Sequence, residues 1–282
     1  METVKDPNVM REKIQKARAE SRVVGFVPTM GFFHEGHLQL MRRARSECDI
    51  VVVSLFVNPT QFGAGEDFED YPRDFERDKQ MAEKEGVDFL FAPEVEDMYP
   101  EGFSTFVEVE GLSKIMCGKY RPGHFRGVAT VVTKLFNIVP AHKAYFGQKD
   151  AQQLAIIRRM VTDLNIPIEI VGVVTVREPD GLAMSSRNIY LTPEERKAAT
   201  ILYRALKTAV EMIEKGEKDA SIIREEMKKL ISEEPLVSLE YIEICDNIYL
   251  KPLQALSGKV LIALAARVGK ARLIDNMLFD LG

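Results

Sequence analysis

Two of the chain's four histidines, His34 and His37, stand three residues apart in the stretch PTMGFFHEGHLQL, residues 28–40. An apolar, β-branched run at residues 23–27 precedes this stretch, and a segment with helical periodicity follows it. In an open α/β sheet, ligands bind beyond the carboxyl ends of the strands, where N–H groups at a helix start attract phosphate. Two neighbouring imidazoles there can stabilise negative charge that develops on the phosphates of a triphosphate. We expect Gly36 to let a nucleotide approach the backbone closely.

Two plainer interpretations of the His34/His37 spacing stay open. Histidines in a loop often form only local hydrogen bonds, and an isolated H-x-x-H spacing is weak evidence for more. A zinc site is the other alternative, although helical zinc pairs usually have i, i+4 spacing and no third His or Cys ligand is evident nearby. The position between a strand, a proline-containing turn and a helix favours the phosphate interpretation.

The elements that position these residues follow from an alternation of short apolar runs and helical patterns. Five runs are typical of buried strands: residues 23–27, 50–57, 87–92, 144–147 and 168–176. Three stretches between them carry apolar residues at helical spacing: residues 37–48, 128–139 and about 150–164. This alternation predicts an α/β fold with a Rossmann-like parallel sheet that has helices on both faces.

The pattern changes after EPDG, residues 178–181, which is a turn signal. Thr192 can cap a helix, Pro193 fits its first position, and Glu195 completes a capping box. We expect one long amphipathic helix from there to about Lys215.

The remaining C-terminal residues predict one more helix and a small sheet. The expected helix runs from Asp219 to about Glu233, and three strand-like runs follow at residues 239–246, 259–268 and 271–276. Helices followed by strands favour an antiparallel arrangement. We therefore predict a Rossmann-like domain over residues 1–176 and a smaller C-terminal α+β lid domain over residues 177–282.

Composition excludes several classes of protein. The chain has 282 residues, 46% of them hydrophobic, and no run approaches the roughly 18 apolar residues of a membrane span. The net charge is −5 with both signs interspersed, which gives no indication of a nucleic-acid surface. The N-terminal residues include acidic side chains and lack the apolar stretch of a signal peptide, so we expect a cytoplasmic protein. Cys48, Cys117 and Cys245 lie far apart, and we expect them to be reduced and mostly buried.

A series of motifs identifies a family. The pattern P-T-M-G-x-x-H-x-G-H resembles the signature of pantothenate synthetases, which are members of the nucleotidylyltransferase superfamily. Five further motifs agree in the expected order: FVNPTQF (56–62), YPRD (71–74), RPGHFRGV (121–128), FGQKDAQQ (146–153) and MSSRN (184–188). This ordered series is far more specific than H-x-G-H, which adenylyltransferases and class I aminoacyl-tRNA synthetases share.

The resemblance implies an AMP-forming ligase that makes a C–N bond. The family condenses pantoate with β-alanine in two steps, first making pantoyl adenylate and pyrophosphate from ATP, then letting the β-alanine amine displace AMP. It also implies Mg²⁺ and a homodimer. No residue stands out as a general base for the second step, where proximity can suffice.

The resemblance implies roles for particular residues in the first domain and the lid. It implies catalytic roles for His34, His37, Lys149, Ser185, Ser186 and Arg187. It implies ATP contacts from Met30, Gly147, Lys149, Asp150, Val176, Met184, Ser185, Ser186 and Arg187. It implies pantoate contacts from Gln61 and Gln153. Arg121, His124 and Arg126 form a basic cluster just before a helix, which suits an anion, so we expect Arg121 and His124 to bind pantoate at the rim of the site; a solvated turn is the alternative.

The residue types suit these roles. A neutral amide can donate to pantoate's carboxylate and accept from its hydroxyls without neutralising the nucleophile. Lys149 suits phosphate oxygens, and Asp150 suits ribose hydroxyls. Residues 184–187 resemble the K-M-S-K-S loop that grips the β and γ phosphates, with Ala183 in place of its first lysine.

Asp78 is the candidate carboxylate for Mg²⁺, because it follows YPRD on an expected helix. Asp74 and Glu76 are close competitors.

Two other functions are alternatives. A related adenylyltransferase for a nucleotide or phosphopantetheine acceptor would share the histidines but would need a phosphate site in place of Gln61 and Gln153. A non-catalytic nucleotide-binding module, or a transfer-RNA-binding relative of the synthetases, belongs to a different class. The net charge of −5 argues against RNA binding, and the joint presence of all the reactive-group motifs argues against an inactive module.

Overall fold

The computed structural model describes residues 1–282, and its backbone contacts divide the chain into two units. Unit 1 comprises Met1–Gln148 and Ile156–Val174, and unit 2 comprises Lys149–Ala155 and Thr175–Gly282. The division differs from the sequence-based boundary chiefly in Lys149–Ala155, which the sequence assigns to the first domain. The division into domains of residues 1–176 and 177–282, with the second as a lid, stays a prediction.

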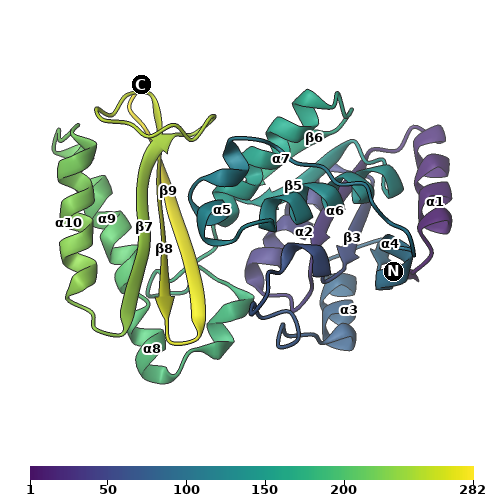
Figure 1. The fold of residues 1–282 in the computed structure, drawn as a ribbon. Coiled ribbons are helices and arrows are strands. Elements are labelled where there is room, and N and C mark those ends of the chain that lie inside the picture. The colour runs from purple at the N-terminus through teal and green to yellow at the C-terminus, as the bar shows by residue number, and fades with distance from the viewer. The chain divides into compact units, whose positions relative to one another are not determined.

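Unit 1 is built on a six-stranded, wholly parallel sheet (Figure 1). Its strands, in spatial order, are β1 (Glu2–Val4), β4 (Phe89–Phe91), β3 (Ile50–Leu55), β2 (Val24–Thr29), β5 (Lys143–Gly147) and β6 (Glu169–Val173). The predicted Rossmann-like parallel sheet is confirmed. The edge strand β1 was not predicted, because three residues of mixed polarity leave no apolar run to detect.

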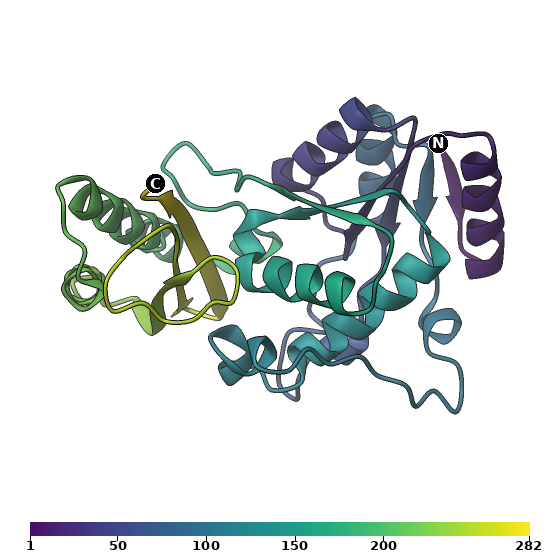
Figure 2. The same ribbon diagram turned by 90° about the horizontal axis from the view of Figure 1, so that it is seen from above.

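Helices cover both faces of this sheet, and Figure 2 shows α2 and α6 on opposite sides of it. The longer helices are α1 (Pro7–Ala19), α2 (Glu35–Glu47), α3 (Phe75–Lys84), α6 (His124–Ile138) and α7 (Ala151–Asp163), the last of which begins in unit 2 and ends in unit 1. The short ones are η1 (Pro59–Gln61), α4 (Val95–Met98), η2 (Leu112–Lys114), α5 (Cys117–Tyr120) and, across the division, η3 (Gln148–Asp150). The core between sheet and helices includes the fully buried Phe26, Phe33, Met41, Leu90 and Tyr145.

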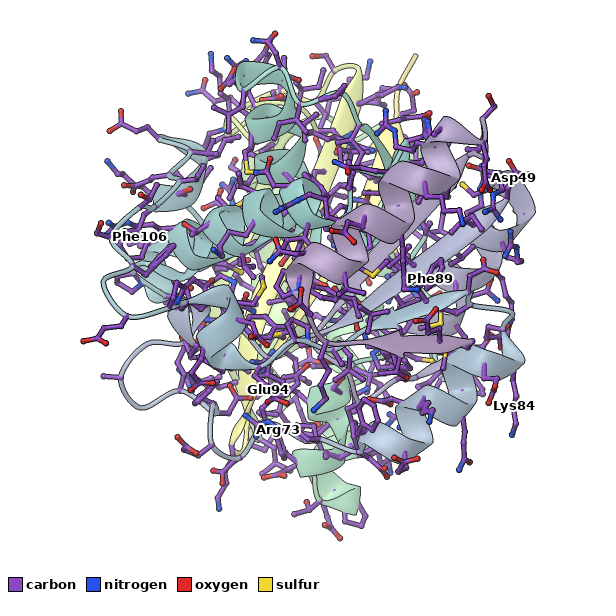
Figure 3. All side chains as sticks on the ribbon, turned by 90° about the vertical axis from the view of Figure 1, so that its right-hand side faces the viewer. Asp49, Arg73, Lys84, Phe89, Glu94 and Phe106 are labelled. Atoms are coloured by element: carbon purple, nitrogen blue, oxygen red, sulfur yellow. The ribbon has the colours of Figure 1, made fainter.

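The order of the strands determines where the loops gather. From β2 the chain moves to β3 and β4 on one side, whereas β5 and β6 lie on the other. The switch point of this open sheet is therefore between β2 and β5, where ligands of such folds bind. Asp49, labelled in Figure 3, is at the opposite, amino end of the strands, where its side chain accepts a hydrogen bond from the Val23 backbone N–H (2.8 Å). The loop that carries His34 and His37 leaves from the carboxyl end of β2.

Unit 2 consists of helices against a three-stranded antiparallel sheet, as predicted. Its elements are η4 (Ser186–Tyr190), α8 (Pro193–Ala198), α9 (Ile201–Glu214), α10 (Ala220–Ser232), β7 (Val237–Asp246), β8 (Lys259–Val268) and β9 (Ala271–Asp280). Figure 1 shows α9 and α10 side by side on one face of the sheet, where they contribute Leu206, Ala209 and Ile223 to its core. The predicted capping box of Thr192 and Glu195 is present.

The prediction of a single long helix from Pro193 to about Lys215 is wrong. The chain turns at Ala199 and Thr200, so that α8 ends there and α9 begins. The Thr200 hydroxyl donates to the Lys197 carbonyl (2.8 Å), a local side-chain bond that competes with helix continuation. Both helices can then bury their apolar residues although they are not collinear.

Two further predictions from composition concern thiols and membranes. All three cysteines are free and buried, as expected. None of the helices has both the length and the apolar character that crossing a bilayer requires.

Candidate active site

A buried carboxylate shapes the loop that joins β2 to α2. Gly31 and Phe32 both adopt positive φ, 89° and 52°, which is costly for the phenylalanine. Asp78 on α3 accepts hydrogen bonds from two consecutive backbone N–H groups, Phe32 at 2.6 Å and Phe33 at 2.7 Å. The Arg77 guanidinium donates to the Phe33 carbonyl (2.8 Å). Two consecutive side chains of α3 therefore hold the left-handed turn in place.

The two histidines follow this turn at the start of α2, where they are hydrogen-bonded to backbone. His34 caps the helix by accepting from the Gly36 N–H at Nδ1 (3.2 Å), and His37 Nδ1 accepts from the His34 N–H (3.3 Å). The ring centroids are 4.1 Å apart. Because each Nδ1 is an acceptor, the neutral rings carry their proton on Nε2, which makes both Nε2 atoms donors. The local hydrogen bonds that the plainer interpretation expects are thus present, and they orient the two Nε2–H donors.

The reason for the glycine between the histidines differs from the one expected. A Cβ at Gly36 would lie 2.9 Å from the His34 ring atoms Cε1 and Nδ1. The missing side chain thus leaves room for the imidazole that caps the helix. From the sequence we expect Gly36 to let a nucleotide approach the backbone. The geometry gives a different reason for the glycine, which is the space that the His34 ring needs.

The expected Mg²⁺ ligand Asp78 does not fit that role. Its side chain is 1% exposed, and both its oxygens are taken by the backbone N–H groups of Phe32 and Phe33. Burial raises the pKa of this carboxyl, although the two N–H groups act in the opposite direction. The competitor Asp74 caps α3 by accepting from the Arg77 N–H (3.1 Å), and Glu76 is exposed. No cluster of three or more His, Cys, Asp or Glu side chains that could hold a metal ion occurs in the structure.

Gln61 is held by buried polar neighbours at the carboxyl end of β3. It is 8% exposed, and its Oε1 accepts from Asn58 Nδ2 (3.1 Å) while its Nε2 donates to Met30 Sδ (2.9 Å). Asn58 is 1% exposed, and its Oδ1 accepts from the Tyr99 hydroxyl (2.8 Å). The structure therefore brings Gln61 and Met30 together. Asn58 was missed, although it stands inside the FVNPTQF motif that identified Gln61.

Arg121 and His124 support the backbone of Gln61. His124 Nδ1 donates to the Gln61 carbonyl (2.8 Å), and Arg121 Nη1 donates to His124 Nε2 (3.1 Å). The guanidinium is paired with Glu66, with Arg121 Nε 2.8 Å from Oε1. Burial raises the pKa of the Glu66 carboxyl, but the hydrogen bonds and charge of Arg121 outweigh it, and the pKa is lowered.

These contacts correct the expected role of the RPGHFRGV motif. The Arg121 charge is already neutralised by Glu66, which no motif in the sequence singled out, so direct capture of pantoate by Arg121 or His124 is not supported. The third basic residue, Arg126, lies 4.0 Å from the centroid of the Phe106 ring, labelled in Figure 3. Arg121 and His124 therefore support Gln61, whereas Arg126 packs against Phe106.

The other candidate residues belong to unit 2, apart from Gly147, which ends β5. Lys149 and Asp150 form η3 with Gln148, and Gln153 lies in the first turn of α7. The Val176 carbonyl accepts from the Met184 N–H (3.0 Å), which closes a hairpin over residues 176–184. Ser185 caps η4 by accepting from the Arg187 N–H (3.3 Å), and Ser186 is 7% exposed. The K-M-S-K-S-like residues 184–187 thus join the end of this hairpin to the helical turn η4.

Comparison with known proteins decides the family. The model of the family described as Pantoate-beta-alanine ligase matches residues 2–278. This chain belongs to the pantoate-β-alanine ligase family. The family is one of ligases, and its match over nearly the whole chain favours the ligase over the related adenylyltransferase.

Individual relatives of this ligase agree in sequence and in fold. The pantothenate synthetase of Heliobacterium modesticaldum is 62% identical over 261 residues, 93% of either chain. The solved pantothenate synthetase of Thermus thermophilus matches with a TM-score of 0.94 at 49% identity, covering 98% of this chain and 99% of that one. The ligase of Francisella tularensis, solved in complex with "Beta-gamma ATP" and β-alanine, matches with a TM-score of 0.79 at 34% identity, covering 99% and 97%.

Proposed function

We propose that this ligase condenses pantoate with β-alanine at the expense of ATP through pantoyl adenylate. A pantoate carboxylate oxygen attacks the α-phosphorus of ATP, and pyrophosphate leaves. The β-alanine amine then attacks the acyl carbon, and AMP leaves. The observation that carries the proposal is the pair of imidazoles with Nδ1 bonded to backbone and Nε2 as donor, at the switch point of the sheet of a ligase-family chain.

His34 and His37 serve the first step as hydrogen-bond donors. Their Nε2–H groups would face the phosphate oxygens on which charge develops, and their backbone bonds fix them there before the reaction begins. Such preorganised donors typically contribute about 10²–10³-fold each to kcat. Proton transfer is not required of them.

Gln61 and Gln153 are proposed to hold pantoate. The Asn58 contact fixes the orientation of the Gln61 amide, and a neutral amide leaves the nucleophilic carboxylate charged. Arg121 and His124 serve pantoate indirectly, because they hold the Gln61 backbone. Proximity to the mixed anhydride then favours attack by the amine of β-alanine.

ATP is proposed to contact the residues that the family resemblance implies. Lys149 and Arg187 would bind phosphate oxygens, with the Ser185 and Ser186 hydroxyls, and Asp150 would accept from the ribose. Met30, Gly147, Val176 and Met184 would line the nucleotide. No cluster of three or more side chains could hold a metal ion, so the Mg²⁺ implied by the family would be held in part by the ATP phosphates, and we derive no step through it.

The homodimer is supported by family resemblance alone. We propose a homodimer in the cytoplasm, with no nucleic-acid or membrane partner. Analytical ultracentrifugation of the purified chain tests the dimer, and a mass of 31.9 kDa across the working concentration range would contradict it.

The test of the function separates the two half-reactions. ATP, Mg²⁺ and pantoate alone should release pyrophosphate, and β-alanine should then start the formation of AMP and pantothenate. A variant carrying both His34→Ala and His37→Ala should lose pyrophosphate release and keep its fold by circular dichroism. Full turnover of that variant would refute the proposed role of the histidines, and release with phosphopantetheine but not pantoate would refute the acceptor.

A further inference from the structure

Two adjacent polar residues are buried in the middle of β9. Asp275 is 3% exposed and Asn276 is 4% exposed, and they pair across the sheet with the apolar Leu264 and Ala263 of β8. Burying polar groups is unfavourable unless each finds a partner. Successive side chains of a strand point to opposite faces, so the two residues have different partners.

Asp275 holds the hairpin that leads into the K-M-S-K-S-like segment. Both its oxygens accept from the Arg177 guanidinium, at 2.6 and 2.9 Å. Arg177 in turn donates to the Gly181 carbonyl (3.0 Å) and is bridged to Ala183 across the hairpin. Met184 follows Ala183 directly, so the ion pair fixes the entry of the segment that contains Ser185, Ser186 and Arg187.

Asn276 holds the other phosphate segment. Its Nδ2 donates to the Lys149 carbonyl (2.8 Å), and its own carbonyl accepts from Arg177 Nη2 (3.2 Å). Asn276 therefore contacts both the backbone of η3 and the hairpin's arginine. The rigid element between the two segments is β9, paired along its length with β8.

We propose that Asp275 and Asn276 are positioning residues for adenylation, which set the backbone of Lys149 and of Met184–Arg187 so that their side chains can bind the ATP phosphates together. The inference rests on the proposed function. Both side chains are buried and bonded to Arg177 or Lys149, so their effect would pass through Lys149 and the hairpin. The small sheet of unit 2 thereby has a function in the first half-reaction.

Asn276→Leu and Asn276→Asp test the proposal, since both keep the approximate side-chain volume and remove the donor to Lys149. We expect weaker ATP binding measured without pantoate, and pyrophosphate release slowed about 10-fold or more, because a small displacement of a positioning group has large kinetic effects. The KM values for pantoate and β-alanine should stay unchanged. Supplied pantoyl adenylate should react with β-alanine at the wild-type rate.

Asp219→Ala is the matched control. Asp219 is the exposed N-cap of α10 in the same unit, so its loss lowers the melting temperature and leaves ATP affinity unchanged. Wild-type ATP affinity and pyrophosphate release in both Asn276 variants would overturn the inference. So would an equal decline of both half-reactions in proportion to a lowered melting temperature.

The ATP-binding measurement separates this inference from the proposed function. If the wild type binds ATP but releases no pyrophosphate with pantoate, the proposed function fails. Weakened ATP binding in the Asn276 variants would still support the positioning role, and unchanged binding would overturn it.

Discussion

The histidine loop of unit 1 and the hairpin of unit 2 are each held by a buried aspartate, but the two carboxylates have different partners. Asp78 accepts from two backbone N–H groups, and its nearest cation, Arg77 Nη1, is 3.5 Å from Oδ1. Asp275 accepts from both terminal nitrogens of Arg177, whose side chain is 19% exposed. One carboxylate fixes backbone directly, and the other fixes it through the half-buried charge of Arg177.

This difference predicts which loop is more fragile. Removing a carboxylate that binds neutral N–H groups leaves dipoles unsatisfied, whereas removing one that binds a half-buried guanidinium leaves an unpaired charge. Removing Asp275 should therefore lower the free energy of unfolding more than removing Asp78 does. Removing Asp78 should displace the histidine loop. Four substitutions test the comparison.

Asp275→Leu should have the largest effect. It leaves the half-buried Arg177 without its counter-charge, and breaking a fully buried pair costs about 3–5 kcal/mol, which is the upper bound here. Urea denaturation followed by circular dichroism measures the free energy of unfolding. The double variant Arg177→Met with Asp275→Leu should recover most of that free energy but not ATP affinity. Wild-type stability of Asp275→Leu would show that the ion pair does not hold the hairpin.

Asp78→Asn should be milder in stability and severe in activity. One amide oxygen can still accept, but the new NH₂ group faces a backbone N–H, which costs about 1–3 kcal/mol. The histidine loop should shift, and pyrophosphate release should fall about 10²-fold. Asp74→Asn is the matched control, since Asn caps a helix as well as Asp does, and it should match the wild type. Equal losses in both variants would favour a shared metal-binding role over the positioning role.

The two regions differ in how much of their structure could be predicted from the sequence. The motif around His34 and His37 placed both residues correctly at the start of a helix, because strand, turn and helix signals are local. Asp78 was identified as important, but as a metal ligand and not as the acceptor that holds the backbone of the histidine loop. Its partners, Phe32 and Phe33, lie more than forty positions earlier in the chain, and no periodicity indicates that a carboxylate will meet backbone rather than metal.

The supports in unit 2 were missed altogether. The run that contains Asp275 and Asn276 was recognised as a strand, but its alternation does not show that two polar residues in it are buried. Their partners, Arg177 and Lys149, lie 98 and 127 positions away. Such pairing is a product of the tertiary fold, which explains why Glu66 beside Arg121 was missed in the same way.

Gly36→Ala sharpens the comparison at the histidines themselves. Alanine favours a helix over glycine by about 1 kcal/mol, so a loss of activity without a loss of stability would come from the contact with the His34 ring. The added Cβ would lie 2.9 Å from that ring, and pyrophosphate release should fall about 10-fold. Gly63→Ala, where the nearest atom to an added Cβ is at 3.9 Å, is the control. An active Gly36→Ala enzyme would show that the ring's position is not critical.

Glu66→Gln should have the smallest effect on stability, and the pH dependence of the melting temperature reveals that effect. The pKa of Glu66 is lowered below its ordinary value of 4.5 in the folded protein, because Arg121 outweighs burial. An acid with a lowered pKa binds fewer protons when folded, so its stabilisation is present above that ordinary value and is lost as the pH falls through the lowered pKa. The wild type should be more stable than Glu66→Gln by about 1 kcal/mol near neutrality, and this difference in stability should close on acidification.

Asp78, whose pKa is raised, should contribute the opposite pH dependence. Its contribution to stability should fall as the pH rises through its titration, so Asp78→Asn should remove that fall. Melting temperatures of the three proteins at a series of pH values measure both slopes, and a gap between the wild type and Glu66→Gln that widens towards low pH would contradict the Arg121 pairing.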